Sequence, residues 1–440
     1  MRFRSLAAAV AGALLLPVAM VATSASASPR DAFAERIGRQ ALPAGDGWAA
    51  FGAGTTGGAA ATPENVVVVD DRAELIAAVA GDTPAIVYVR GTIRGNVDDS
   101  GAPLSCEQVA DPAYSLDAFL AAYDPAVWGR VAPSGPLEEA RARSAANQSA
   151  RIRVNVGSNK TIVGLRGATL NGIFLRLDGV SNVIIRNLTH EDTRDCFPVW
   201  SPTDGGTGNW NAAYDNIWIR NSRHVWVDHN TFTDADNPDS AQPLYFGRPY
   251  QVHDGQVDIT NGSNYVTVSY NRFTNHDKTM LIGSTNTPGV DVGALKVTLH
   301  HNEFDGSVQR APRVRFGQVD VYNNLYRVPV ADPYEYGWGV GVQSAIYAEN
   351  NYVAFGPGVA PDAFVYDWGG TALTEKGTWA RVGRALPRPV SLLAAYNATH
   401  DPDIAGDAGW VPTLRAGPVL PAPAVPLVVE ILAGAGRLPL

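Results

Sequence analysis

Residues 251–283 read QVHDGQVDITNGSNYVTVSYNRFTNHDKTMLIG, and this stretch decides the fold. At residues 257–259 and 266–270, β-branched or aromatic side chains occupy every second position, with polar residues between them. A period of two predicts strands that bury one face. Asn261, Gly262 and Asn271 predict turns after these strands. The polar side chains should therefore project from one face of a stiff scaffold, where a functional site could lie.

Short strand patterns of the same kind recur from residue 151 onward. They cover residues 161–163, 183–185, 217–219, 225–227, 266–268, 297–299, 319–321 and 346–348. Most end in asparagine, at Asn187, Asn221, Asn230, Asn271, Asn302, Asn323 and Asn350. The last two intervals are 21 and 27 residues, and such an irregular repeat predicts stacked coils that bury their faces against one another. Asparagine suits these turns because it tolerates left-handed backbone and can bond to its equivalent one coil away.

We predict an all-β fold, a right-handed parallel β-helix with short capping helices and long decorating loops. A sandwich should show hairpin turns and alternation along whole strands, and a propeller should repeat a signature about every 40–50 residues. The sequence shows neither pattern. Ahead of the solenoid we expect helices at 31–39 and 71–79, strands at 66–69 and 85–89, and a long excursion with short helices at 99–150. The apolar tail at 425–433 should fold over an open end.

The N-terminus has the form of an export signal. Arg2 and Arg4 precede an apolar core at residues 6–22, and the small residues 25–27 predict cleavage before Ser28. We therefore expect a signal peptide at 1–27, a single domain over 28–440, and a secreted, extracellular protein. No other stretch is long and apolar enough to span a bilayer, so no membrane association is expected after cleavage.

Composition limits the partners of this chain of 440 residues. A hydrophobic content of 45% with only 18% charged residues supports a large core and excludes global disorder. The net charge of −9 lacks the basic footprint of a nucleic-acid-binding protein, so a polyanionic partner would need local cations or a bound metal. Cys106 and Cys196 could form one disulfide in an oxidising compartment, or remain two buried thiols.

Four charged residues have the spacing of one residue per coil. Asp215, Asp258, Lys278 and Arg310 follow one another at intervals of 43, 20 and 32 residues. If the loops vary in length, these side chains form a column in which each coil adds about 4.8 Å. Arg313 and Arg315 follow Arg310 closely and point to one side by alternation. Guanidinium groups bind carboxylates bidentately, although an isolated run of arginines is more often a solvated or salt-bridged edge.

Three aspartates are candidate metal ligands. Asp254 and Asp258 would lie about 13 Å apart on a straight strand, and Gly255 permits a bend that brings them together. With Asp215 they would offer the oxygen ligands that calcium prefers. An isolated aspartate is more often a solvated turn residue. Their interleaving with Lys278 and the arginines favours a functional site.

Other candidate groups are interpreted as structural. Asp228 and His229 have no obvious serine nucleophile beside them, so we expect a buried, satisfied pair. His300 and His301 lack a complete metal set. Asp234 and Asp236 lie in a loop rich in Asp, Asn and Pro and are interpreted as turn formers.

The stretches YDNIWI, HVWVDHNTF, DGQVDI, NYVTVSYNRF, HDKTMLIG and RAPRVRFG, in this order, resemble the extracellular pectate lyases of polysaccharide lyase family 1. The resemblance covers most of the mature chain. It implies a right-handed parallel β-helix that cleaves α-1,4-linked polygalacturonate by calcium-dependent β-elimination. We expect a monomer that acts on polygalacturonate or pectin. By matching motifs, Asp215, Asp254 and Asp258 would bind Ca²⁺, Arg310 would abstract the C5 proton, and Lys278, Arg313 and Arg315 would hold substrate carboxylates, with Lys278 and Arg315 also serving catalysis.

The chain departs from this pattern at two places. Some relatives carry two aspartates near the first strand, where this chain has Ala213 and Asp215, and a glutamate in place of Asp254. Calcium should therefore bind weakly until substrate completes the site.

Three other functions compete with this interpretation. A pectin lyase would act on methyl-esterified polymer and lack the calcium carboxylates, which Asp215, Asp254 and Asp258 argue against. A polygalacturonase would need a tight acidic set, which is not found on the same column. A non-catalytic β-solenoid that binds cell-wall polysaccharide would not require the arginine run at 310–315.

Overall fold

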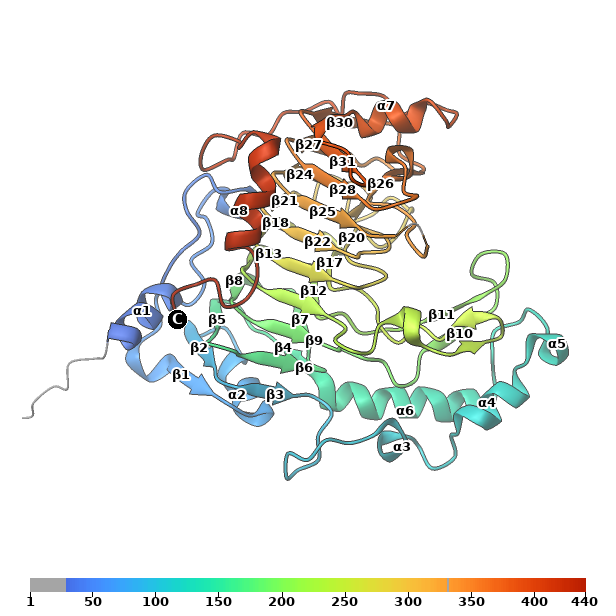
Figure 1. Cartoon of the computed structure of the whole chain (residues 1–440). Helices are drawn as coiled ribbons and strands as arrows, with labels where there is room; N and C mark the ends of the chain where they lie inside the picture. Colours follow the sequence, from blue (N-terminus) through green and yellow to red (C-terminus); the bar gives the residue numbers. More distant parts are fainter. Residues whose placement is uncertain (1–28, 331) are drawn as a thin grey trace, which may run out of the picture.

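The computed structural model describes residues 29–330 and 332–440, so the predicted signal peptide at 1–27 lies outside the described residues. Successive coils each add one strand to three sheets that run along the stack (Figure 1). The strands within these sheets pair in parallel, apart from one antiparallel pair at the end of the third sheet. With right-handed crossovers between parallel strands, this is the predicted right-handed parallel β-helix.

The three sheets are named I, II and III. Sheet I contains β1 (Val66–Val69), β2 (Ala85–Val89), β5 (Lys160–Gly164), β8 (Ser181–Arg186), β13 (Arg223–Asp228), β18 (Asn264–Ser269), β21 (Val297–His300), β24 (Gln318–Tyr322), β27 (Ala345–Glu349) and β30 (Leu373–Lys376). Sheet II contains β4 (Arg153–Asn155), β7 (Phe174–Asp178), β12 (Ile217–Arg220), β17 (Val257–Thr260), β20 (Leu281–Ile282), β23 (Arg313–Val314), β26 (Trp338–Gly341) and β29 (Val365–Trp368). Sheet III contains β3 (Thr92–Arg94), β6 (Thr169–Asn171), β9 (Thr189–Glu191), β14 (Thr231–Thr233), β19 (Arg272–Thr274), β22 (Glu303–Asp305), β25 (Leu325–Val328), β28 (Tyr352–Phe355), β31 (Trp379–Val382) and β32 (Arg388–Pro389).

The interior of the stack is built from equivalent side chains on successive coils. Phe232, Phe273, Phe304 and Tyr326 stack face to face, with ring centroids 4.9, 4.9 and 5.0 Å apart. These distances match the spacing of neighbouring strands, so one aromatic ring fills the interior at each of these four coils.

The predicted asparagine turns divide into two sets. Asn187, Asn221, Asn323 and Asn350 adopt left-handed backbone, with φ between 48° and 60°. The amide ladder instead runs through the residue that follows this position, at Asn230, Asn271, Asn302, Asn324 and Asn351. In it, the side-chain oxygen of each asparagine accepts a hydrogen bond from the backbone N–H of the residue one coil earlier. Both properties expected of asparagine are therefore used, but by neighbouring residues.

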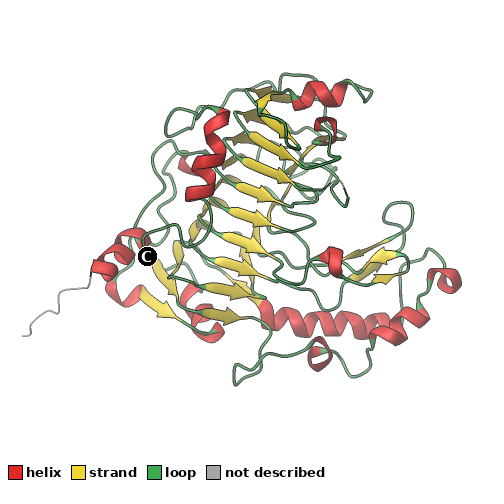
Figure 2. Cartoon of the chain, viewed as in Figure 1, coloured by secondary structure: helices red, strands yellow, loops and turns green. Residues whose placement is uncertain are grey.

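Helices cover the ends and one side of the stack (Figure 2). At the N-terminal end lies α2 (Arg72–Val79), whose first turn is capped by Asp71. The other end is covered by α7 (Leu392–Asn397), which contacts β29 and β30. The predicted placement of the apolar tail was wrong, because α8 (Val425–Leu432) packs on the side of sheet III, where Val425 and Val429 contact Leu325.

The excursion expected at 99–150 contains a longer helix than predicted. Three short helices, α3 (Cys106–Val109), α4 (Leu116–Ala122) and α5 (Pro125–Trp128), precede the 17-residue α6 (Pro136–Ile152). The hairpin β10–β11 (Val199–Ser201, Asn209–Asn211) lies beside α4 and α6, and together they form an arm that projects from the stack (Figure 1). A second, short hairpin joins β15 (Leu244–Tyr245) and β16 (Arg248–Pro249).

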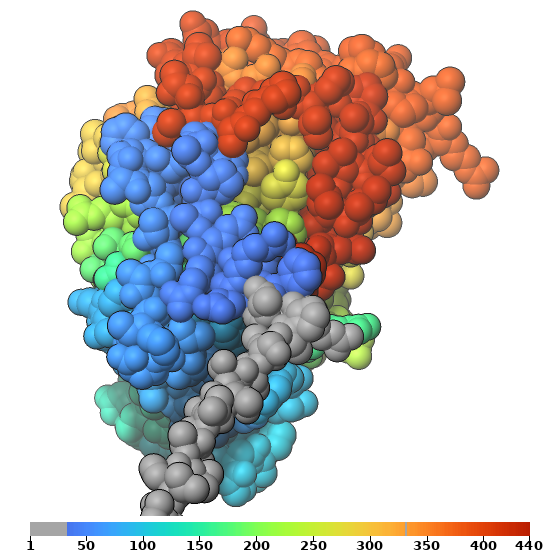
Figure 3. All heavy atoms as spheres, turned by 90° about the vertical axis from the view of Figure 1, so that its left-hand side faces the viewer, coloured from blue at the N-terminus to red at the C-terminus, as the bar shows by residue number. Residues whose placement is uncertain are grey.

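A disulfide between Cys106 and Cys196 ties α3 to the segment before β10 and confirms the pairing that the sequence left open. At the opposite side, α1 (Pro29–Gly38) and the segment after it run along sheet I, next to the C-terminal segment (Figure 3). The two segments are joined where the Gly47 N–H donates to the carbonyl oxygen of Leu414. Across the described ranges, no helix combines the length and hydrophobicity needed to cross a membrane.

Candidate active site

The predicted site residues lie on four neighbouring strands of sheet II. Asp215 lies two residues before β12, Asp258 lies within β17, and Lys278 and Arg310 lie three residues before β20 and β23. Each therefore comes from its own coil, as the spacing predicted. They do not form a single column. On the neighbouring strand, Asp258 lies beside Trp218 and not beside Asp215, and Lys278 lies beside Gln309 and not beside Arg310.

Two carboxylates converge on the backbone of Gly255. Asp215 accepts a hydrogen bond of 2.8 Å from the Gly255 N–H, and Asp258 accepts one of 2.9 Å from the Leu281 N–H. A Cβ at position 255 would lie 2.3 Å from Asp258 Oδ1 and 2.8 Å from Asp215 Oδ1. Glycine is therefore required here because the two carboxylates approach its backbone closely, and not for left-handed backbone, since its φ is outside that region.

The electrostatics of this pair favour a cation. Asp215 and Asp258 are each only 6% exposed. Burial raises the pKa of both carboxyl groups, and repulsion from neighbouring aspartates raises it further. Two buried oxygen ligands that repel one another match the donor set that a hard divalent ion prefers. These residues fit Ca²⁺.

The third predicted ligand leaves this site open on one side. Asp254 is 30% exposed at its side chain and points toward Lys278, with Oδ1 3.7 Å from Nζ. Among the described residues, the one group of three acidic, histidine or cysteine side chains that gathers within 4.8 Å is Asp70, Asp71 and Glu74. That exposed group caps α2. Asp254 therefore does not close a three-carboxylate cage with Asp215 and Asp258 among the described residues.

The three arginines of the 310–315 run have different partners. Within the described residues, no hydrogen bond or ion pair involves the Arg310 guanidinium, and its Nε is buried without an acceptor. Arg313 lies over the Trp368 ring, 3.8 Å from its centroid. Arg315 donates to Asn286 Oδ1 at 2.6 Å and to the carbonyl oxygen of Gly283 at 2.8 Å. Among the described residues, Arg310 is therefore the arginine of this run whose guanidinium makes neither a hydrogen bond nor a contact with an aromatic ring.

The charges that act most strongly on Arg310 are carboxylates. Burial disfavours its charged form, but the carboxylates of Asp254 and Asp258 outweigh burial and raise the pKa of Arg310. Burial and the charge of Arg315 instead lower the pKa of Arg313 to about 10, and burial and Arg310 lower that of Arg315. In the protein alone, Arg310 is thus held protonated by the same carboxylates that fit a cation.

A buried histidine–aspartate network below the site was missed. His276 contacts Asp234 Oδ1 through Nδ1 at 2.8 Å and the Asp254 carbonyl oxygen through Nε2 at 2.6 Å. Asp234 forms a turn as predicted, since its carbonyl oxygen accepts a hydrogen bond from the Asn237 N–H, but its side chain is also buried and paired, whereas Asp236 is exposed. Burial opposes a charge on His253, but hydrogen bonds to Asp192 and Asp239 raise its pKa to about 10. No sequence spacing signals these contacts, since they join different turns.

The remaining polar candidates lie close to other polar side chains, and of the first predicted pair Asp228 is buried whereas His229 is half-buried. His229 Nδ1 lies 2.8 Å from Asp228 Oδ1, and Asp228 also pairs with the buried Arg186. His300 and His301 are buried and contact each other through their Nδ1 atoms at 2.8 Å.

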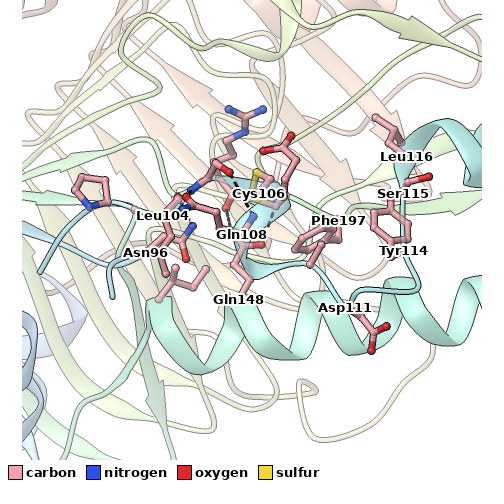
Figure 4. Close-up of a pocket in the computed structure, with 18 of the residues that line it drawn as sticks. Asn96, Leu104, Cys106, Gln108, Asp111, Tyr114, Ser115, Leu116, Gln148 and Phe197 are labelled. Atoms are coloured by element: carbon pink, nitrogen blue, oxygen red, sulfur yellow. Dashed lines mark hydrogen bonds between the residues drawn. A yellow bond between two sulfur atoms is a disulfide. The ribbon is translucent and has the colours of Figure 1, made fainter. Parts of the chain in front are cut away.

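A large cavity lies away from these residues. It measures about 1070 Å³ and is lined by Cys106, Tyr114, Gln148 and Phe197, among others, from α3, α6 and the segments beside them (Figure 4). None of the predicted site residues lines it. The predicted site is instead a surface on sheet II.

Comparison with known proteins agrees with this geometry. The family model for pectate lyase matches residues 131–367. The chain is 45% identical to the pectate lyase of Bacillus subtilis (strain 168) over 421 residues, which cover 93% of this chain and 96% of the relative. The solved structure of the thermostable pectate lyase PL 47 superimposes with a TM-score of 0.89 at 46% identity, over 91% of this chain and 99% of that one. A structure of a pectate lyase bound to a hexasaccharide matches with a TM-score of 0.86 at 44% identity, with the same coverage of 91% and 99%. The chain therefore belongs to the pectate lyase family, and with it to the polysaccharide lyases.

Proposed function

We propose that the sheet II site cleaves α-1,4-linked polygalacturonate by calcium-dependent β-elimination. The observation that carries this proposal is the convergence of the buried Asp215 and Asp258 carboxylates on Gly255, near the guanidinium of Arg310, which has no hydrogen-bond partner among the described residues. Asp215, Asp258 and the more exposed Asp254 would hold the ion. Calcium, when bound, would neutralise these carboxylates and withdraw charge from a substrate carboxylate beside them.

The cationic side chains of the site suit an acidic sugar. β-Elimination from a uronate builds negative charge at C5, so the sugar carboxylate must be neutralised. Lys278 and Arg315 are assigned to this carboxylate, and Arg313 to a neighbouring one. Lys278 is 5% exposed and Arg315 is 8% exposed, and their charges act strongly because little water screens them.

Arg310 is assigned the role of the base. It takes the proton from C5, the C5–H electron pair forms the double bond between C4 and C5, and the bond from C4 to the glycosidic oxygen breaks, with that oxygen leaving with the bonding pair and taking a proton from water. Asp254 and Asp258 raise its pKa in the protein alone, and their neutralisation would remove that effect. Lys278, Arg313 and Arg315 would then be the charges left around it, and like charges favour the neutral form of a base.

We further propose that residues 1–27 direct export, that residues 28–440 form one domain, and that the mature protein acts outside the cell as a monomer. The support is the signal pattern of the N-terminus and the single hydrophobic core that runs through the coils of the stack. N-terminal sequencing of the secreted protein should begin at Ser28, and a start elsewhere would contradict the boundary.

Removing the charge of Asp258 should have opposite effects on the stability of the calcium-free protein and on calcium binding. A raised carboxyl pKa in the folded state means that stability falls as pH rises from the unfolded value, about 4, through the folded value. Asp258→Asn should therefore raise the melting temperature of calcium-free protein at neutral and alkaline pH, and abolish the stabilisation that calcium gives the wild type.

Differential scanning calorimetry with chelator and with calcium measures both effects. The exposed Asp236→Asn is the matched control and should change neither. If Asp258→Asn melts no higher than wild type in chelator and still gains stability from calcium, Asp258 is not a ligand.

A further inference from the structure

We propose that Trp218, Arg176 and Arg220 form a second binding subsite for an acidic sugar, on the same face of sheet II as the Asp258 site. This subsite would hold a uronate unit of the polysaccharide chain that is being cleaved, away from the bond that breaks. The inference rests on the proposed function only for the identity of that chain.

The strand register places the subsite directly next to the candidate active site. Trp218 on β12 is the lateral partner of Asp258 on β17, and Arg176 on β7 is the lateral partner of Trp218. Neighbouring strands are about 4.8 Å apart, so Trp218 lies one coil and Arg176 two coils, about 10 Å, from Asp258 along the stack. Both point outward, since Ile217 and Ile219 on either side of Trp218 are fully buried.

The subsite carries an excess of positive charge in an acidic protein. The guanidinium carbons of Arg176 and Arg220 each lie 5.6 Å from the centroid of the Trp218 ring. Both arginines pair with one carboxylate, that of Asp178. Two guanidinium groups that share one carboxylate leave one positive charge uncompensated. Their side chains are 28% and 36% exposed, so they are accessible to a second carboxylate that binds bidentately.

The ring between these arginines is fixed before any ligand arrives. Trp218 Nε1 donates a hydrogen bond of 2.9 Å to Thr260 Oγ1, and Phe174 stacks against the indole. A side chain that is already held loses little conformational entropy on binding. The half-buried indole offers an apolar surface for the C–H face of a pyranose ring, while the arginines receive its carboxylate.

The face as a whole is arranged for a chain that runs along the stack. On the far side of Asp258, Arg313 on β23 is separated from it by one strand, β20. Arginines therefore lie on both sides of the candidate calcium site, and the carboxylates of that site lie between them. A single sugar could not reach both groups of arginines, whereas an extended polyuronate could. Chain length should therefore determine how much this subsite contributes.

The test is the dependence of cleavage on substrate length. Trp218→Ala and Arg220→Gln are compared with wild type on oligogalacturonates from trimer to octamer. We expect KM to rise and kcat/KM to fall by a factor that grows with length, from less than about 2 for the trimer to about 10 for the octamer, as for loss of a single aromatic or arginine anchor. Trp128→Ala and Arg223→Gln, at exposed residues on α5 and at the start of β13 in sheet I, are the matched controls and should behave as wild type.

Two results would overturn the subsite. An equal fall at every length would assign Trp218 a structural role, and an unchanged octamer would remove it from the substrate path. Binding of the same oligomers, measured by calorimetry, tests the subsite independently of the proposed reaction. If no unsaturated product forms, the proposed function fails, and the length dependence of binding in Trp218→Ala still decides whether the subsite exists.

Discussion

Lysine in place of Arg310 should leave the protein folded and remove nearly all of its turnover. Among the described residues, the Arg310 guanidinium has no hydrogen-bond or ion-pair partner and, unlike that of Arg313, lies over no aromatic ring, so we expect folding not to depend on its planar head group. Loss of a positioned base typically lowers kcat by about 10²–10⁴-fold. Lysine retains the charge but offers a single flexible nitrogen in place of the rigid guanidinium fork.

The comparison is informative because lysine is the weaker base in water. A free guanidinium has a pKa near 13, so its neutral form at pH 9 costs about 5 kcal/mol, and lysine with a pKa near 10.4 would cost less. If proton affinity alone mattered, the variant would be active at a lower pH. We expect inactivity, because the position of the nitrogen is what the site provides. The wild type should show an alkaline optimum, since the base acts in its neutral form.

Initial rates of unsaturated product formation, measured across pH, test both statements. Arg223→Lys, an exposed position on sheet I, is the matched control and should retain the wild-type profile. Near-normal turnover by Arg310→Lys would refute the assignment. A wild-type pH–rate profile that peaks near pH 5 would also contradict the assignment, since a guanidinium is fully protonated at that pH.

The fold was predictable because one of its three sheets has a clear sequence signature. Seven of the eight recurring strand patterns are strands of sheet I, and the eighth, 217–219, lies in β12 of sheet II. Sheet I strands reach six residues, long enough for alternation to appear. The strands β20 and β23 of sheet II have two residues each, and no periodicity can be read from two residues. Sheets II and III had to be inferred from the repeat alone.

The turns show why the register was less predictable. Asn323 and Asn350 were assigned both left-handed backbone and the amide ladder, but the ladder belongs to Asn324 and Asn351. Adjacent asparagines are equivalent in sequence, and only packing against the previous coil separates their roles. The same limit applies to the site. Spacing placed one residue on each coil correctly, but bends before the strands shift Asp215 and Asp258 to different register positions.

The contacts of His276 could not be predicted for a related reason. They connect Asp234 and the Asp254 backbone across three turns whose lengths differ. Turns without periodicity give no rule for which side chains meet, so a buried network of this kind becomes visible only in three dimensions.

Removal of calcium should abolish the lyase reaction. Excess chelator at alkaline pH should stop the rise in absorbance of the unsaturated uronate product on polygalacturonate, by at least about 10³-fold, because stabilisation of transition-state charge by a metal is worth several kcal/mol. Added calcium should restore the rate. Magnesium should restore less of it, since Mg²⁺ gives up its bound waters reluctantly and would contact a substrate carboxylate less readily than Ca²⁺ does.

The carboxylates themselves explain why the loss should be so complete. Without an ion, Asp215 and Asp258 repel one another in a buried site, and with Asp254 they keep Arg310 protonated, so chelation removes substrate binding and base formation together. A reaction that continues unchanged in chelator would mean that these carboxylates hold no ion, and comparable cleavage of methyl-esterified polymer would then identify a pectin lyase. Binding of polygalacturonate without any product, with or without calcium, would instead leave a solenoid that only binds the polysaccharide.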